Sequence, residues 1–256
     1  MMKIIATLME PTEGSVYIDN LNIYKNRREI REILGYLPQE FNAYPGLTAY
    51  EVLDYIASLN GLRGKKKKTE IENILYTTNL YNIQDRKVKT FSGGMIRRLG
   101  IAQALINSPK LLIVDEPTTG LDPEERIKFR NLLSEISGDR VVILSTHIVG
   151  DISSTCNDLA ILNKGEIIFH SEPEKLIKIA EGKTWKIIVP EEKLNEVRSR
   201  LSIISMIINH SHLELRVVGD SVDGFDAEQV EPNLEDAYIY LMAVKLGEVM
   251  EEEDIV

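Results

Sequence analysis

The stretch Leu111-Leu112-Ile113-Val114-Asp115-Glu116-Pro117 joins four consecutive apolar residues to two carboxylates and a proline. A continuous apolar run is typical of a parallel strand that is covered on both faces. Val141-Val142-Ile143-Leu144 repeats this pattern. Because such strands alternate with helices along the chain, we predict an α/β fold with a mostly parallel sheet.

Helices are predicted upstream of the first apolar run, over about residues 48–108. Thr48-Ala49-Tyr50-Glu51 matches a capping box that begins one helix, and residues 92–107 indicate another. We predict that Lys65 to Lys68 forms a solvated loop and that a helix follows from about Thr69 to Leu80. Together these helices would form a helical subdomain.

The sequence patterns before residue 48 and after residue 180 differ from those in the middle of the chain. We interpret Met1 to Met9 as the body of a helix without an N-cap, and residues 15–19 and 33–38 as strands. Beyond Trp185, short strands and helices predict a small α+β appendage, closed by a helix over residues 235–246. We therefore predict a first domain over 1–180 and an appendage over 181–256.

Composition excludes several classes of protein. Lys+Arg 30 against Asp+Glu 40 gives a net charge of -10, which argues against nucleic acid as a partner. The single cysteine, Cys156, forbids a disulfide within the chain and fits a reducing cytoplasm. No apolar run approaches the ~18 residues that a spanning helix needs.

The carboxylates Asp115 and Glu116 stand where ligands bind in α/β sheets, at the carboxyl end of a strand. Asp115 is suited to a water-coordinated Mg²⁺, and Glu116 is suited to polarise an attacking water. Alone, the pattern is moderately specific, because apolar residues followed by Asp-Glu also occur at ordinary strand ends.

Phe91-Ser92-Gly93-Gly94 opens a predicted helix. Ser92 can cap it, the two glycines let a phosphate approach the backbone, and the helix N-terminus adds partial positive charge. An ordinary glycine-containing cap explains the same residues equally well. His147 and Gln39, each at a predicted strand end, carry little information by themselves.

Taken together and in this order, the motifs resemble the ATP-binding domain of ABC transporters. Ser92-Gly93-Gly94 resembles the family signature, and Asp115-Glu116 resembles the Walker B motif. Thr119-Gly120-Leu121-Asp122 is similar to the D-loop, while His147 and Gln39 match the switch histidine and the Q-loop glutamine. The resemblance covers roughly residues 1–175 and is very specific as a set. The closing stretch from Leu234 to Leu241 resembles ATPases of ABC-2-type exporters.

The resemblance implies a role for each residue. Glu116 and His147 would be catalytic, and Asp115 and Gln39 would serve Mg²⁺. Ser92, Gly93 and Gly94 would contact the γ-phosphate of ATP held by a second ATPase subunit, in a homodimer or a heterodimer. Asp122 would organise that dimer. Residues from about 41 to 80 would face membrane permease subunits, which implies a cytoplasmic protein at the inner face of the membrane.

The family's phosphate-binding loop, G-x-x-x-x-G-K-[ST], precedes its first helix and is not found in these 256 residues. Gly182-Lys183-Thr184 is not this loop, because Ile177 stands where its first glycine belongs. Losing four charge-assisted bonds of ~1.5–3 kcal/mol each would cost about 6–12 kcal/mol of ATP binding. The expectation is a P-loop-type fold, truncated before its N-terminal strands and phosphate loop, that cannot bind ATP alone.

Two functions therefore stay open at this stage. The first is an ATP-binding subunit that couples ATP hydrolysis to transport through a permease. The alternative is a non-catalytic or degenerate subunit that at most supplies its signature face to an intact partner. A wrong start, a truncation and real degeneration would all leave the same sequence, and whether the chain is an enzyme stays undecided.

Overall fold

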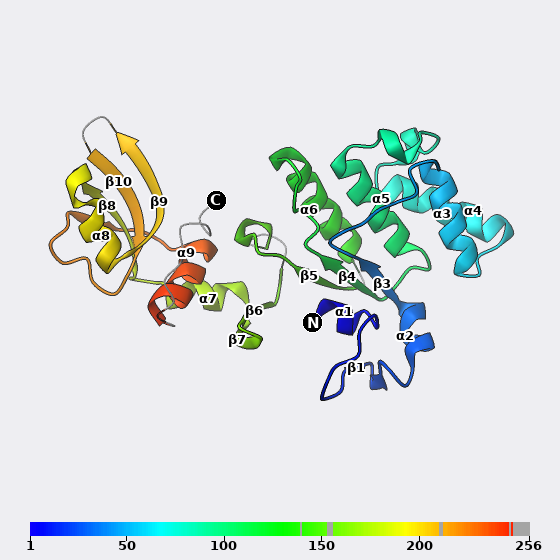
Figure 1. Ribbon diagram of the computed structural model, residues 1–256, viewed down its shortest axis with the longest axis horizontal. Helices are drawn as coiled ribbons and strands as arrows, with labels where there is room; N and C mark the ends of the chain where they lie inside the picture. The colour runs from blue at the N-terminus through cyan, green and yellow to red at the C-terminus, as the bar shows by residue number, and fades with distance from the viewer. Residues whose placement is uncertain (139, 153–155, 210–211, 246, 248–256) are drawn as a thin grey trace. The chain divides into compact units, whose positions relative to one another are not determined.

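The computed structural model describes residues 1–138, 140–152, 156–209, 212–245 and 247 (Figure 1). The chain divides into two compact units, Met1–His147 and Ile148–Val256, which we call unit 1 and unit 2 and describe separately. We predict the domain boundary near residue 180 instead. The compact units are defined by contacts within the fold and do not test a domain boundary. The boundary near residue 180 therefore stays a prediction.

Unit 1 is built on a parallel sheet in the order β3-β4-β5. Its strands are β3 (Leu34–Leu37), β4 (Leu111–Asp115) and β5 (Val141–Ser145). All pairs are parallel, and Asp115 lies opposite Ser145 at the end of the β4–β5 ladder. The parallel sheet and the α/β class predicted from the sequence are confirmed.

The two faces of β4 explain its unbroken apolar run. Leu111 and Ile113 pack against Met2 and Ala6 of the N-terminal segment, which begins with helix α1 (Met2–Ile5). Their neighbours in the strand face the larger core, which is completed by α5 (Gly93–Leu105) and α6 (Pro123–Ser137). Alternate residues of a strand point to opposite faces, so both faces must be apolar.

Strand β5 is less covered than its sequence predicts. Val141 is 63% exposed and the rest of the strand is half-buried. Within the described residues, β5 pairs only with β4 and therefore forms one edge of the sheet. Strand β3 pairs with β4 on the side away from β5. A side chain at Gly35 in β3 would overlap the carbonyl oxygen of Ala104, so this glycine lets α5 pack directly on the strand.

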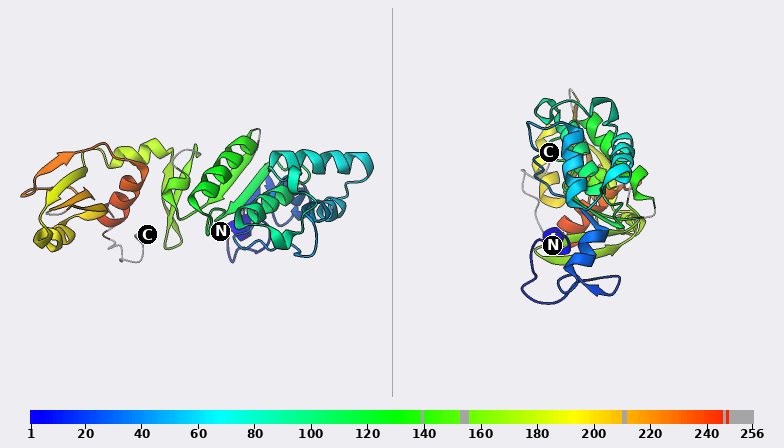
Figure 2. Two further views of the ribbon diagram at one scale, coloured as in Figure 1. Left: turned by 90° about the horizontal axis from the view of Figure 1, so that it is seen from above. Right: turned by 90° about the vertical axis from the view of Figure 1, so that its right-hand side faces the viewer.

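The helical subdomain consists of α3 (Ala49–Leu59), α4 (Gly64–Thr77) and α5, and Figures 1 and 2 show α3 and α4 in cyan at one end of unit 1. The predicted capping box is confirmed. The Thr48 hydroxyl accepts from the Glu51 amide at 3.1 Å, and the Thr48 amide donates to the Glu51 carboxylate at 2.7 Å.

The predicted loop at Lys65 to Lys68 is wrong, because these lysines form the first turns of α4. Lys67 Nζ lies 2.5 Å from Asp54 of α3, and Lys68 pairs with Glu72 one turn later at 3.8 Å. Lysine has good helix propensity, and these pairs offset repulsion among the four charges. A run of like charge was therefore insufficient to predict a loop.

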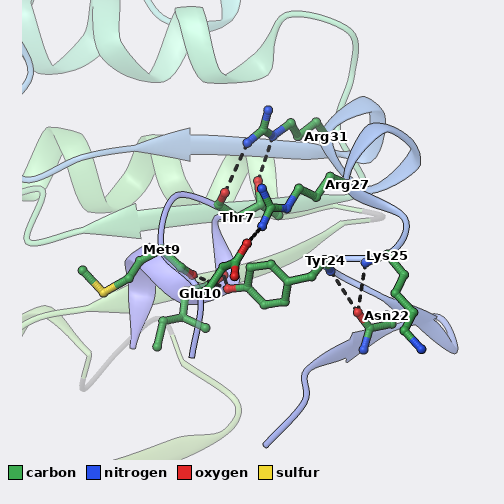
Figure 3. Close-up of polar contacts among 9 residues, drawn as sticks. Thr7, Met9, Glu10, Asn22, Tyr24, Lys25, Arg27 and Arg31 are labelled. Carbon is green, nitrogen blue, oxygen red and sulfur yellow. Dashed lines mark hydrogen bonds and ion pairs between the residues drawn. The ribbon is translucent and has the colours of Figure 1, made fainter. Parts of the chain in front are cut away.

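Side-chain contacts, shown in Figure 3, join the N-terminal segment to α2 (Arg27–Ile33) and to Tyr24 just before it. Arg31 Nε donates to the Thr7 hydroxyl at 2.9 Å, Arg27 pairs with Glu10, and the Tyr24 hydroxyl donates to the carbonyl of Met9. Helix α1 is shorter than predicted. Its chain turns at Thr7, which has a left-handed φ of 61°.

Two further strands lie in this segment, and short 3₁₀ turns link the longer elements. The strands, β1 (Tyr17–Ile18) and β2 (Leu21–Asn22), form a small antiparallel pair, so the strand predicted over residues 15–19 is shorter. The 3₁₀ turns are η1 (Tyr81–Ile83), η2 (Val88–Thr90), η3 (Val149–Asp151) and η4 (Glu191–Lys193).

Unit 2 contains a hairpin and a four-stranded antiparallel sheet. The hairpin joins β6 (Leu159–Asn163) to β7 (Glu166–Ser171). Its two turn residues, Lys164 and Gly165, both have positive φ, as a type I′ turn requires. The sheet has the order β11-β8-β10-β9, with β8 (Thr184–Val189), β9 (Ser202–Asn209), β10 (His212–Val218) and β11 (Ala227–Gln229).

The helices of unit 2 are α7 (Pro173–Ile179), α8 (Leu194–Arg200), α9 (Leu234–Ile239) and the π-helical turn η5 (Tyr240–Lys245). The closing helix is therefore present, with a change to π-helical bonding at Tyr240. Leu246, its predicted last residue, lies outside the described residues. Among the described helices of both units, none combines the length and apolar character needed to cross a membrane.

Tyr240 gives unit 2 a measurable dependence on pH. Burial, together with its 2.8 Å hydrogen bond to Asp220, raises the pKa of Tyr240 to about 12 from an ordinary 10.0. Because the folded state favours the neutral phenol, this stabilisation is complete below pH ~10 and is lost as pH rises through ~12. Ring-carbon NMR of ¹³C-tyrosine-labelled protein, with Tyr240→Phe to assign the signal, should give a titration midpoint for Tyr240 near pH 12. A midpoint at or below ~10 would contradict it.

Candidate functional site

Asp115 ends β4 and is held by two hydroxyl groups from the neighbouring strands. Ser145 Oγ of β5 donates to Asp115 Oδ1 at 2.5 Å, and the Tyr36 hydroxyl of β3 donates to Asp115 Oδ2 at 3.4 Å. Burial and the charge of Asp115 raise the pKa of Tyr36. The phenol therefore stays protonated as a donor, and the carboxylate is oriented from both sides.

Glu116 follows at a sharp backbone turn. Its φ is 48°, a left-handed value that costs a non-glycine residue free energy and is characteristic of functional sites. The Glu116 amide donates to the Ser145 carbonyl at 3.0 Å and lies 3.2 Å from Ser145 Oγ. β5 thus holds the backbone of Glu116 in the turned conformation.

The Glu116 carboxylate gathers two polar side chains. The Thr119 hydroxyl donates to Glu116 Oε2 at 3.1 Å, and His147 Nδ1 lies 2.5 Å from the same oxygen. The side chain of Glu116 is 20% exposed and that of His147 is 65% exposed. A carboxylate held in this way keeps its second oxygen for a water or another donor, as a general base requires.

The predicted signature residues begin α5. Ser92 is its N-cap, with the side-chain oxygen accepting from the Met95 amide at 3.3 Å. In the described part of the chain, no hydrogen bond or ion pair joins Ser92, Gly93 or Gly94 to Asp115, Glu116 or His147. The structure therefore groups the predicted site residues into two sets, one at the strand ends and one at the start of α5.

Asp122 begins α6 in the same way. Its side chain accepts from the Glu125 amide at 2.9 Å, so it caps the helix that follows the predicted D-loop. Glu125 in turn pairs with Arg98 of α5 at 2.6 Å. The starts of α5 and α6 are therefore joined directly by side chains.

Gln39, which follows β3, lies with signature and D-loop residues around one cavity of about 430 Å³. The side chains and backbone that line it come from three segments: Gln39, Glu40, Phe41, Asn42, Gly93, Ile96, Arg97, Thr119, Gly120 and Leu121. Arg97 Nη1 donates to the carbonyl oxygen of Gln39 at 2.5 Å, which fixes this segment to α5. Burial lowers the pKa of Arg97.

The residues at the strand ends fit a magnesium ion bound mostly through water and phosphate. Mg²⁺ is commonly held by one or two protein carboxylates with waters and substrate oxygens, so no dense ligand cluster is needed. Among the described residues, Asp115 accepts from two hydroxyl donors and keeps lone pairs for a coordinated water. Gln39 is exposed just beyond the adjacent strand β3.

Comparison with known proteins gives the family. A family model described as "ABC transporter" matches residues 1–119. The ABC transporter ATP-binding protein NatA of Bacillus subtilis is 33% identical over 178 residues, which cover 69% of this chain and 72% of NatA. The chain belongs to the ATP-binding proteins of ABC transporters. The resemblance inferred from the motifs is confirmed.

Other members of the ABC family agree in sequence and in fold. The probable multidrug ABC transporter ATP-binding protein YbhF of Escherichia coli is 30% identical over 256 residues, covering 94% of this chain. The chain spans 44% of the length of that relative. A solved structure described as an ATP-binding cassette, MJ0796, bound to ADP and Pi, superposes with a TM-score of 0.59 at 28% identity, covering 67% of this chain and 78% of its own.

Sequence reasoning missed the side chains that orient Asp115 and Glu116. Ser145, Thr119 and Tyr36 each donate a hydroxyl to Asp115 or Glu116. Ser145 could have been found from the parallel register, because side chains at paired positions share one face of a sheet and Ser145 pairs with Asp115. Thr119 and Tyr36 gave no comparable signal, since their roles depend on how the strand ends converge.

Proposed function

We infer that the protein containing this chain hydrolyses ATP to drive transport through a membrane permease, with Glu116 as the general base. The observation that carries the proposal is the arrangement at Glu116, whose carboxylate is held by Thr119 and His147 at the end of a parallel sheet. Membership of the ABC family supports the same function.

Each residue at the strand ends has a separate role in this proposal. Glu116 accepts a proton from the water that attacks the γ-phosphate, and positioned acid–base groups contribute about 10²- to 10⁴-fold. His147, mostly exposed, reaches the same phosphate and orients the carboxylate. Asp115, oriented by Ser145 and Tyr36, and Gln39 are the residues that would hold the magnesium ion. The magnesium ion, when bound, neutralises charge on the phosphates.

The signature residues act on a second subunit. Ser92, Gly93 and Gly94 contact the γ-phosphate of ATP bound by the partner copy, and Asp122 lies at the interface between the two. Gly93 lines an open cavity together with the D-loop residues Thr119, Gly120 and Leu121, where a phosphate from a second chain could reach it. In either a homodimer or a heterodimer, one ATP would contact two chains.

The helical subdomain provides the surface for the permease, which places the protein at the inner face of the membrane. Tyr44 and Tyr55 are exposed and meet edge to face with ring centroids 6.2 Å apart, and Leu59 of α3 is 66% exposed. Exposed aromatic and aliphatic side chains of this kind are common at protein interfaces.

Mixed dimers test the proposal against a non-catalytic role. The protein is purified with its permease, and Mg²⁺-dependent phosphate release is measured with wild-type chain, Glu116→Gln or Ser92→Arg. In a dimer with one wild-type chain, we expect each substitution to remove hydrolysis at one of the two sites, Glu116→Gln at the site of its own chain and Ser92→Arg at the site of its partner. A rate that Glu116→Gln leaves unchanged and Ser92→Arg abolishes would instead indicate a chain that only lends its signature to an intact partner.

A further inference from the structure

Glu125, in the first turn of α6, contacts Asp122 at the start of that helix and Arg98 of α5. Its amide donates to the Asp122 side chain at 2.9 Å, and its carboxylate oxygen Oε2 lies 2.6 Å from Arg98 Nη2 in α5. The pair is poorly accessible, with side-chain exposures of 16% for Arg98 and 22% for Glu125. An ion pair with this little solvent is screened far less than a surface pair.

Gly94 shapes the space that Glu125 occupies. A Cβ atom at Gly94 would overlap the Glu125 carboxylate, so the absence of a side chain lets Glu125 lie directly against the signature backbone. Gly93 has no such neighbour, since the nearest atom to its Cβ position is a Leu121 methyl group at 3.7 Å. The second glycine of the signature therefore has a packing role in addition to any contact with phosphate.

We propose that Glu125 is a positioning residue for the signature motif. Paired with Arg98 and seated against Gly94, it sets where Ser92-Gly93-Gly94 lies relative to the D-loop residues Thr119 to Asp122. The inference rests on the proposed function, in which both segments face the ATP of a second subunit. It contacts Arg98 and Gly94 of α5 and also Asp122, so its effect passes through α5 and the start of α6.

Glu124 offers a matched control in the same helical turn. It has the same side chain, is 79% exposed and pairs at 2.6 Å with Lys128, which also lies 3.3 Å from Glu125 Oε1. In the complete protein with its permease, we expect Glu125→Ala to lower kcat about 10- to 100-fold, because displacement of a reacting group by about 1 Å costs that much. Glu124→Ala should stay within about twofold, as surface changes usually do.

Glu125→Gln separates positioning from a failure to fold. Glutamine keeps the volume against Gly94 and a hydrogen bond to Arg98 but loses the charge. We expect it to lower kcat less than Glu125→Ala does, and both variants should elute as the wild type does in size-exclusion chromatography. Equal activities for the Glu124→Ala and Glu125→Ala variants would overturn the inference.

Mixed dimers show on which subunit Glu125 acts. Single-turnover hydrolysis is measured for each mixed dimer, and the reference is a dimer of one wild-type chain and one Glu116→Gln chain. With Glu125→Ala in one chain and Glu116→Gln in the other, one ATP site stays intact and hydrolysis should equal the reference. With both changes in one chain, hydrolysis should fall at least 10-fold below it. The reverse pattern would overturn the inference, because Glu125 would then act within its own subunit's site. A wild-type protein without any hydrolysis would instead contradict the proposed function.

Discussion

Replacing Glu116 by glutamine should reduce ATP hydrolysis by about 100- to 10,000-fold, the usual contribution of a positioned general base. Glutamine retains the size of the side chain and can still accept from Thr119 and His147, whose donors lie 3.1 Å and 2.5 Å from Oε2. It cannot take a proton from water. The substitution therefore removes the chemistry and keeps the geometry.

Phosphate release by the complete protein with its permease measures the loss, and equilibrium binding of ATP measures what is kept. We expect the affinity for ATP to change by less than about threefold, since uniform binding and transition-state stabilisation are separate quantities. Asp158→Asn is a suitable control, because Asp158 forms a comparable carboxylate–histidine pair with His170, at 3.0 Å, in unit 2. Hydrolysis that persists within about tenfold would contradict the role of Glu116 as the base.

The parts of the fold that follow from local sequence were predicted well. The apolar run before Asp115 specifies a covered parallel strand, because both faces of β4 are buried. Thr48 and Glu51 specify a helix start, because both halves of a capping box lie within four residues. In each case the interacting groups are close in the sequence, so the pattern alone contains the information.

Features that depend on distant pairs could not be predicted. The lysines of α4 were predicted to form a loop because Asp54, which neutralises Lys67, lies on another helix. Glu125 was overlooked because it belongs to no recognised motif and its partner, Arg98, is 27 residues away. Charge pairs of this kind are found from the packing of elements, and packing is fixed only once the whole fold is known.

The candidate site lies between these two cases. Asp115, Glu116 and His147 were chosen from motifs, and the structure brings the last two together at the strand ends. The motifs gave no indication of Ser145 and Tyr36, which orient Asp115. Motifs therefore identified the groups proposed to do chemistry, whereas the groups that hold them were visible only in the folded chain.

Replacing Asp236 by alanine should destabilise unit 2 by about 3–5 kcal/mol, as expected when one partner of a buried ion pair is removed. The Asp236 side chain is fully buried and accepts from Arg216 Nε at 2.8 Å and Nη2 at 2.6 Å. It also accepts from the Asn233 amide at 2.7 Å, completing the capping box of α9. The hydrogen bonds to Asp236 raise the pKa of Arg216 in the wild-type protein. Without Asp236 the guanidinium would still be charged beside the gap, because arginine is effectively always protonated in proteins.

Hydrogen exchange of the β8 and β10 amides measures this loss directly, because it reports the opening of unit 2 without assuming that the whole protein unfolds in one step. Exchange at the β4 amides provides an internal reference, since that strand lies in the separate core of unit 1. Glu235→Ala, at the exposed neighbouring position, should change the opening free energy that the β8 and β10 amides report by less than about 0.5 kcal/mol.

A second variant separates the ion pair from the packing around it. Asp236→Leu combined with Arg216→Met replaces both charges by apolar groups, and buried pairs replaced in this way often lose little stability or gain some. We therefore expect the double variant to recover most of the protection that Asp236→Ala removes. If the double variant exchanged as fast as Asp236→Ala, the loss would come from the broken cap of α9, and the charge of Arg216 would not be its cause.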